Sequence, residues 1–262
     1  MNTKLKALAL AGTILAAPIV ANAASAASII GLIDGKSLVW IDPATKKVTG
    51  KADIKGAANV VGIDVRPADG MLYAVSADGG IYTVDAKSGQ ATMKSKLSET
   101  LKSGVTVTVD FNPVADRLRI LTSEGTSLRV NVDDGKATVD GSLKFKDGDA
   151  NAGKTPMVVA GAYTNSANPK PSATALYNID ATTGSLVSQA PPNDGILNTI
   201  GSLGVKINGA IAFNIVNKGE DNAAWLVTGG MLYSVDLKTG KATSAGKLEG
   251  VTGKLTDIAW MD

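Results

Sequence analysis

The chain has 262 residues, of which 26 are Lys or Arg and 24 are Asp or Glu, so its formal charge is only +2. This near-neutral balance argues against a basic surface for nucleic acid or anionic lipid. The chain also lacks His and Cys, which excludes zinc chemistry, a Ser-His-Asp triad and disulfide bonds.

The first 23 residues have the pattern of a secretory signal peptide. Lys4 and Lys6 precede an apolar run at 7–20, and the ANA sequence at 21–23 is a small-x-small cleavage site. The run is shorter than the roughly 20 apolar residues that span a bilayer. We therefore expect an exported protein without a transmembrane segment, periplasmic or extracellular. Residues 24–262 should form a single domain and a monomer.

A short apolar strand that ends in Asp and a tight turn recurs five times after the leader. The copies are LVWIDPATKK (38–47), IYTVDAKSGQ (81–90), LRVNVDDGKA (128–137), LYNIDATTGS (176–185) and LYSVDLKTGK (232–241). A second apolar element also recurs. One equivalent position in each copy, which we call its anchor, recurs every 46 to 52 residues: Asp64, Asp110, Ala162, Ala212 and Ala259. With a further strand on either side of each turn, these units predict the blades of a β-propeller.

The ends of the chain supply the two halves of one blade. The last anchor, at 257–262, has no strands after it, and the first hairpin, at 29–48, has no anchor before it. Pairing them would close the ring and hide its edges. We predict an all-β fold of five four-stranded blades, with a sixth blade around 140–156 or a two-sheet sandwich as alternatives.

The repeated turns contain five Asp residues that could be taken for a set of ligands: Asp42, Asp85, Asp133, Asp180 and Asp236. Asp initiates tight turns by accepting hydrogen bonds from its own backbone, and the Gly that follows supplies positive φ. One such turn per blade does not converge on a point. We interpret these residues as structural.

The third copy, at about 105–143, departs most from the others. Three of the four Arg residues of the chain, Arg117, Arg119 and Arg129, fall within it. The planar guanidinium suits carboxylate or phosphate. The same copy contains Asp110, Asn112, Asp116, Asn131 and Asp140. Two interpretations stay open: an internal Arg–Asp network between blades, or a site for an anionic ligand.

Two of the five anchors are carboxylates. If the anchor strands surround a central channel, Asp64 and Asp110 lie near its mouth, one blade apart. A carboxylate pair is what acid–base glycoside hydrolysis requires. The alternative is an ordinary structural role.

Two loops carry further polar groups. In DGDANAG (147–153), Asp147, Asp149 and Asn151 have an alternating spacing that suits Ca²⁺, although the Gly and Glu of a complete EF-hand loop are missing. The alternative is an Asx-rich loop without metal. In QAPPNDG (189–195), two prolines stiffen the approach to Asn193 and Asp194, which gives either a binding element or a connection.

The motifs DFNPVADRLRI (110–120), LRVNVD (128–133), GDANAG (148–153), AYTN (162–165), LYNID (176–180) and PPNDG (191–195) resemble the bacterial domain-of-unknown-function family 4394. The resemblance covers about 30–260 and implies an exported protein without an established activity. The motifs mark Asp110, Asn112, Arg117, Arg119, Arg129, Asn131, Asp149, Asn151, Tyr163, Asn165, Asn193 and Asp194. Their concentration in the third and fourth blades indicates a shared site or a shared local network.

These observations favour a non-enzymatic binding module for a small anionic ligand or a protein partner. The expected site residues are Asp110, Asn112, Arg117, Arg119, Arg129, Asn131, Tyr163, Asn165, Asn193 and Asp194. The alternatives are a hydrolase or lyase that uses Asp64 and Asp110, and a structural component of the envelope or matrix. No cofactor is expected apart from the Ca²⁺ considered above.

Overall fold

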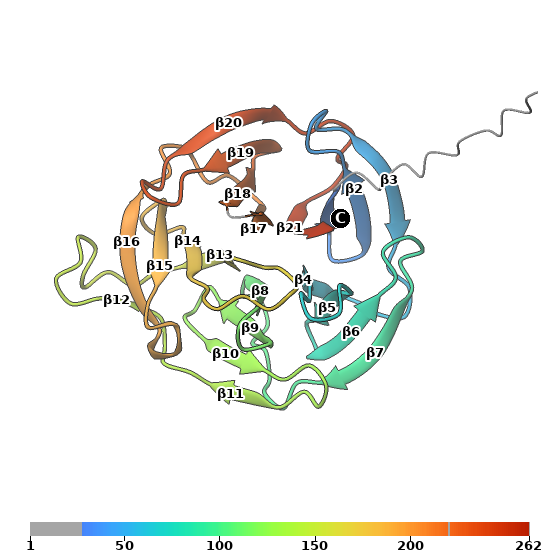
Figure 1. Ribbon diagram of the computed structural model, residues 1–262, viewed down its shortest axis with the longest axis horizontal. Helices are drawn as coiled ribbons and strands as arrows, with labels where there is room; N and C mark the ends of the chain where they lie inside the picture. The colour runs from blue at the N-terminus through green and yellow to red at the C-terminus, as the bar shows by residue number, and fades with distance from the viewer. Residues whose placement is uncertain (1–27, 220, 262) are drawn as a thin grey trace, which may run out of the picture.

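Five antiparallel sheets are arranged around a central axis in the computed structural model, which describes residues 28–219 and 221–261 (Figure 1). The signal peptide expected at 1–23 lies outside the described residues. Each sheet has four antiparallel strands, and the fourth sheet has one additional strand. The chain is therefore a five-bladed β-propeller, as the repeats predict, and neither a sandwich nor a six-bladed ring.

Blade 1 closes the ring by pairing the two ends of the described chain. Strand β1 (Ser28–Ile33) lies between β21 (Leu255–Met261) and β2 (Ser37–Ile41), and β3 (Val48–Asp53) forms the outer edge. The predicted closure is thus confirmed. Because β21 pairs with β1 along its length, no long strand edge is left between the first and last blades.

The other blades follow in chain order, each with its innermost strand first. Blade 2 contains β4 (Val60–Val65), β5 (Leu72–Ser76), β6 (Gly80–Val84) and β7 (Ala91–Lys96). Blade 3 contains β8 (Val107–Asn112), β9 (Arg117–Thr122), β10 (Ser127–Val130) and β11 (Ala137–Val139). Blade 4 contains β13 (Val158–Tyr163), β14 (Leu176–Asp180), β15 (Ser185–Gln189) and β16 (Ile196–Ser202). Blade 5 contains β17 (Ile211–Lys218), β18 (Asp221–Thr228), β19 (Met231–Val235) and β20 (Ala242–Lys247).

The segment at 140–156 belongs to blade 4. Its short strand β12 (Lys144–Phe145) pairs in parallel with β16 as a fifth, outermost strand. The one helical element in the described part of the chain is a 3₁₀ turn, η1 (Pro192–Asp194), between β15 and β16. Accordingly, no helix in 28–219 or 221–261 is long and apolar enough to cross a membrane.

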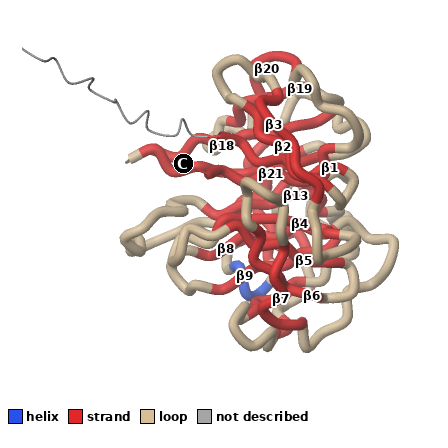
Figure 2. Tube along the Cα trace, turned by 90° about the vertical axis from the view of Figure 1, so that its right-hand side faces the viewer, coloured by secondary structure: helices blue, strands red, loops and turns tan. Residues whose placement is uncertain are grey.

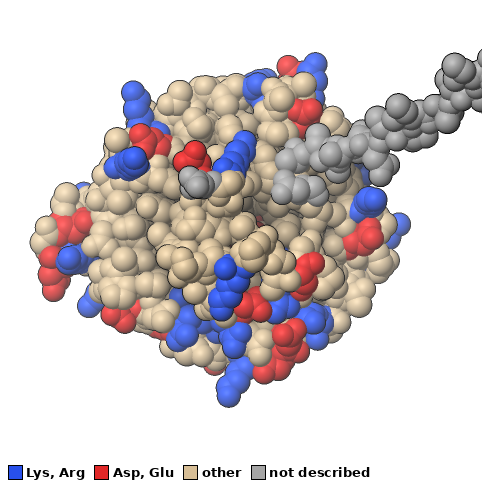
Figure 3. Space-filling view, viewed as in Figure 1, with Lys and Arg blue, Asp and Glu red and all other residues tan. Residues whose placement is uncertain are grey.

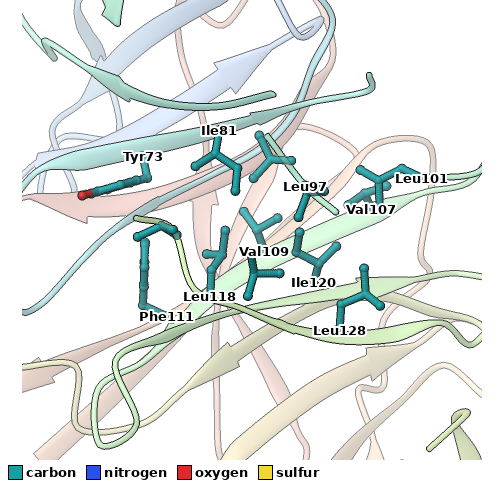
Figure 4. Packing of buried hydrophobic residues seen from close by; sticks show 13 residues of the cluster. Tyr73, Ile81, Leu97, Leu101, Val107, Val109, Phe111, Leu118, Ile120 and Leu128 are labelled. Atoms are coloured by element: carbon teal, nitrogen blue, oxygen red, sulfur yellow. The ribbon is translucent and has the colours of Figure 1, made fainter. Parts of the chain in front are cut away.

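The inner strands β21, β4, β8, β13 and β17 contact one another around the axis, and the loops project on both sides of the ring (Figures 1 and 2). The buried apolar side chains form five clusters, one at each junction between neighbouring blades. At the blade 2–blade 3 junction the rings of Tyr73 and Phe111 are in contact, with their centroids 5.2 Å apart (Figure 4). The core is therefore distributed between blades rather than gathered in one centre.

Four of the five repeated Asp residues stabilise their turns as expected. Asp42, Asp85 and Asp236 each accept backbone N–H groups two and three residues further along. The Oδ2 atom of Asp180 accepts the N–H of Thr183 at 2.9 Å. These side chains are part of the turn geometry, as interpreted.

In blade 3 the turn position belongs to Asn131, and the assignment of Asp133 is wrong. The Oδ1 atom of Asn131 accepts the N–H of Asp133, and the Asn131 backbone pairs with Lys136 as the Asp85 backbone pairs with Gln90. Asp133 lies two residues too late for this role. Its carboxylate instead lies 3.0 Å from the ammonium group of Lys94.

Candidate functional site

Blade 3 has one apolar face and one polar face. Along its strands, Val109, Leu118 and Leu128 pack toward blade 2, whereas the residues next to them in sequence point toward blade 4. Successive side chains of a strand alternate between faces, so the sequences VTVDFN, RLRILT and SLRV separate the two kinds of residue. The marked Asp, Asn and Arg residues of this blade therefore share one face.

Strand register then places these polar residues in rows. Asp110 pairs with Arg119, Arg119 with Arg129, and Arg129 with Thr138, which makes one row across all four strands. Directly paired residues of antiparallel strands have side chains on the same side. Burial decreases outward along this row, from Asp110 and Arg119, which are buried, to Thr138, which is exposed.

The buried Arg119 joins blade 3 to blade 4. Its Nε donates to the hydroxyl of Tyr163 at 3.2 Å, and its Nη2 donates to Oδ1 of Asn193 at 2.9 Å. Its Nη1 donates to Ser127 at 3.0 Å and to Asp140 at 2.5 Å. With only 2% of its side chain exposed, Arg119 satisfies its donors inside the protein. This is the internal network that the sequence left open as one of two interpretations.

Asp140 is shared between two guanidinium groups. Arg129 binds it through two hydrogen bonds, Nε to Oδ2 at 2.8 Å and Nη2 to Oδ1 at 2.9 Å. Burial alone would raise the pKa of Asp140, but the hydrogen bonds from Arg129 and Arg119 outweigh it and lower the pKa. Asp140 therefore stays ionised and fixes the plane of Arg129.

The outer end of the polar face forms a shallow groove of about 170 Å³, which we call the blade 3 groove. It is lined by Arg117, Arg129, Asn131, Asp134, Lys136 and Thr138. Arg117 is exposed, and in the described structure its guanidinium has one hydrogen-bond partner, the carbonyl oxygen of Asp116. Figure 3 shows basic side chains gathered over this blade, interleaved with acidic ones. The groove thus offers unused N–H donors. Its lining carries three positive charges, on Arg117, Arg129 and Lys136, and one negative charge, on Asp134.

The remaining marked residues do not reach this groove. Asn112 caps the turn after β8, where its Oδ1 accepts the N–H groups of Val114 and Ala115. Asn165 exchanges hydrogen bonds with Asn222 of blade 5 at 2.7 Å in each direction. Asp194 is exposed at the end of η1. The expected site residues are therefore divided among a groove, an internal network, the inner strand that carries Asp110, and three separate positions.

The loop considered for Ca²⁺ packs against β16. Both carboxylate oxygens of Asp149 accept hydrogen bonds from Thr199, from its N–H at 2.7 Å and from its hydroxyl at 2.6 Å. Asn151 donates to the same hydroxyl at 3.0 Å, and Asp147 is exposed. Within residues 28–219 and 221–261, no three carboxylate side chains lie together in an arrangement that could hold a metal ion. The Ca²⁺ site stays a prediction, and these contacts already give the loop an anchor.

The two anchor carboxylates lie in the wall of the central channel, joined there by a third that the sequence analysis missed. Asp64 accepts the backbone N–H of Phe111 in blade 3, and Asp110 accepts that of Tyr163 in blade 4. Asp257 accepts the N–H of Ile63 in blade 2 at 2.9 Å. All three link an inner strand to the next blade. Asp257 stands two residues before the anchor Ala259, on the same side of the strand, and that spacing could have revealed it.

Burial raises the pKa of all three carboxyl groups. For Asp64, desolvation is only partly offset by hydrogen bonds from Phe111, Val65 and Asn214, and its pKa is raised to about 7. Desolvation also raises the pKa of Asp110, and the nearby charge of Asp64 adds to this effect. The pKa of Asp257 rises for the same reasons.

A larger hollow of about 340 Å³, here called the channel-mouth pocket, opens where β4, β17 and β21 end. Asp64 and Asn214 lie in it together with Trp260, and the loop after β13 adds Ser166 and Asn168. Sequence reasoning did not find Asn214 and Trp260. Asn214 is two residues after the anchor Ala212, so strand alternation could have placed it on the channel side.

Comparison with known proteins identifies the family. The sequence matches a domain of unknown function, DUF4394, over residues 25–259. The chain belongs to the DUF4394 family. The match extends over all five blades, which agrees with the resemblance noted from the motifs. No curated protein matches the sequence.

Several solved structures are similar to this DUF4394 protein, one of them with a TM-score above 0.5. A protein of unknown function from Bacteroides thetaiotaomicron has 16% identity and a TM-score of 0.53, over 88% of this chain and 63% of that one. Another, from Bacteroides caccae, has 13% identity and a TM-score of 0.45, over 85% and 73%. An auxiliary nutrient binding protein from Bacteroides ovatus has 13% identity and a TM-score of 0.45, over 75% and 55%. At such identities the likeness concerns the fold alone.

Proposed function

We propose that this DUF4394 protein is an exported binding module that holds a carboxylate- or phosphate-bearing ligand in the blade 3 groove. The observation that supports this is the set of unused guanidinium and ammonium donors on Arg117, Arg129 and Lys136, which converge on one hollow. A hollow of about 170 Å³ suits a single anionic group of a larger molecule better than a whole drug-sized ligand.

The inner part of the polar face prepares this groove. Asp140 takes up Nε and one Nη2 hydrogen of Arg129, which leaves Nη1 free to donate to a ligand. Arg119 holds Asp140 in turn. We therefore assign Arg119 a positioning role and expect Arg117 and Arg129 to touch the ligand. A guanidinium that is already oriented loses less conformational entropy on binding.

The experiment is calorimetric titration at low salt with glucuronate and glycerol phosphate, each paired with its neutral counterpart, glucose or glycerol. We expect one of the two anions to bind, and each neutral counterpart to fail. Arg117→Ala should weaken binding at least about tenfold, since a charge-assisted hydrogen bond contributes about 1.5–3 kcal/mol. Lys238→Ala, which removes one exposed positive charge from blade 5, is the matched control and should bind normally.

The outcomes separate the alternatives. Binding that falls equally in Arg117→Ala and Lys238→Ala would indicate general charge attraction and would contradict a site in the groove. If no anion binds while Arg119→Ala lowers stability, the polar face serves only to join blades, as in the structural role considered from the sequence.

An acid–base role for the channel carboxylates is a second candidate. The observation in its favour is the pKa of Asp64, raised to about 7 in a residue that lines the channel-mouth pocket. Asp110 is not among the residues that line this pocket, so the pair expected from the sequence is represented there by one carboxyl group. Turnover of a glycoside, phosphoester or lactone that is lost in Asp64→Asn would establish this role.

A further inference from the structure

The channel-mouth pocket contains a buried carboxyl group without a positive counterpart. Asp64 is only 7% exposed, yet it lines a hollow of about 340 Å³. Its carboxylate accepts the N–H of Phe111 at 2.7 Å, and the Asn214 amide lies against it from the opposite side of the channel. Among the described residues, no Lys or Arg forms an ion pair with Asp64.

The neighbouring charged groups do not supply that counterpart. Asp257 approaches from β21 and Asp110 from β8, and both add negative charge. Immediately after the strand of Asp64, Arg66 is engaged with Asp116 at 2.6 Å. Tyr73, the partner of Asp64 on β5, donates its hydroxyl to Asp69. Lys218 lies over the ring of Trp260, 5.4 Å from its centre. The channel around Asp64 thus has an excess of carboxyl groups.

An isolated ionised carboxylate is costly to bury, so it either takes up a proton or is paired with a cation. The raised pKa of Asp64 corresponds to uptake of a proton. The pocket provides room for the second. Its remaining lining combines amide and hydroxyl groups, from Asn168, Asn217 and Ser166, with apolar residues such as Pro67 and Trp260.

We propose that the channel-mouth pocket binds a small organic molecule through an ammonium group that forms an ion pair with Asp64. Binding exchanges one proton: the ammonium group takes the place of the acidic hydrogen, which leaves for solvent. Asn214 orients the carboxylate, and the apolar wall contacts the hydrocarbon part of the ligand. This site shares no lining residue with the blade 3 groove, so the two proposals are independent.

The test uses 1,4-diaminobutane and ethanolamine as probes, with 1,4-butanediol and ethylene glycol as neutral counterparts. Binding is followed by calorimetry and by the fluorescence of the stacked pair Trp225 and Trp260 in a Trp40→Phe background. Between pH 5.5 and 8.5 the probes remain protonated while the ionised fraction of a group with a pKa of about 7 rises about 30-fold. We expect the affinity for at least one amine to rise by a similar factor, and calorimetry in two buffers to show release of a proton at the lower pH.

The variant Asp64→Asn keeps an oxygen for the Phe111 N–H and should remove both the binding and its pH dependence. Glu99→Gln, which removes an exposed carboxylate from the loop between β7 and β8, is the control and should bind amines as the wild type does. Binding of the diols as tightly as the amines would overturn the proposal. So would the absence of amine binding, or amine binding that is independent of pH. Proton release is measured on the wild type, so the proposal stays testable if Asp64→Asn does not fold.

Discussion

The two faces of blade 3 solve the same packing problem with different interactions. Toward blade 2, side chains such as Phe111, Leu118 and Ile120 form a continuous apolar cluster with Tyr73 (Figure 4). Toward blade 4, the strand residues in between meet their neighbour through Arg119 and its hydrogen bonds, beside a smaller apolar cluster. The same four strands supply both faces. The two faces therefore differ only in the side chains that they present, not in backbone structure or in distance from the axis.

The difference concerns specificity. Apolar packing stabilises in proportion to buried area and tolerates rearrangement, whereas a buried guanidinium requires each donor to find an acceptor. Every acceptor of Arg119 comes from a defined place: Tyr163 from β13, Asn193 from η1, Ser127 from β10, and Asp140 from the segment that follows β11. A propeller does not need such a contact to close, because four of its junctions close with larger apolar clusters. This contrast is the reason to connect the polar face with function.

The largest effect should come from the apolar face. Phe111→Ala removes a fully buried ring from the blade 2–blade 3 junction, and we expect a loss of about 3–5 kcal/mol in the free energy of unfolding. Urea denaturation at low and high salt measures it, and the loss should be the same at both. A loss below about 1.5 kcal/mol would mean that the aromatic contact with Tyr73 is not a major part of this junction.

A smaller effect is expected from the polar face. Arg119→Ala should cost about 2–3 kcal/mol, less than the 3–5 kcal/mol of a fully orphaned buried charge, because Arg129 keeps Asp140 paired. Arg119→Met should cost less than Arg119→Ala, since it fills the space without adding a polar group. Arg117→Ala, at an exposed position, should change stability by no more than about 0.5 kcal/mol. Equal costs for Arg119→Ala and Arg117→Ala would contradict the distinction between network and groove.

The alternation of apolar and polar residues along the strands explains how much of the fold and of the candidate site could be predicted from the sequence. The repeats and the alternation in VTVDFN and RLRILT were sufficient for five blades, for closure of the ring, and for Arg117 and Arg119 on one strand face. They could not reveal that Arg119 is buried while Arg117 is exposed. That depends on Asn193, 74 residues further along the chain, and on the position of η1. The anchor pattern uses one position in each inner strand. Asp257 and Asn214 lie two residues from their anchors on the same strand face, and the pattern therefore does not include them.

The smallest expected effect is a change in how the stability of the protein depends on pH. Only the polar face of blade 3 should contribute to it. The pKa of Asp140 is lowered by its Arg partners, so the stability it contributes is present above the unfolded pKa of about 4 and is lost as the pH falls through the folded value. The apolar face does not titrate. Asp140→Asn should therefore lose less stability than the wild type between pH 5 and pH 3, whereas Phe111→Leu should show the wild-type acid loss. Thermal unfolding of the three proteins at both pH values measures this difference.

Asp64 should change the pH dependence of stability in the opposite direction to Asp140. This difference provides an internal control. Its pKa is raised to about 7 in the folded state, so its relative stabilisation is complete below about pH 4 and is lost as the pH rises from 4 to 7. Asp64→Asn should therefore flatten the decline above pH 4 without changing the acid loss that Asp140 governs. If Asp64→Asn and Asp140→Asn instead altered the same part of the pH profile, the channel and the polar face would titrate as one unit. The contrast between the two faces of blade 3 would then have to include the channel that lies beside them.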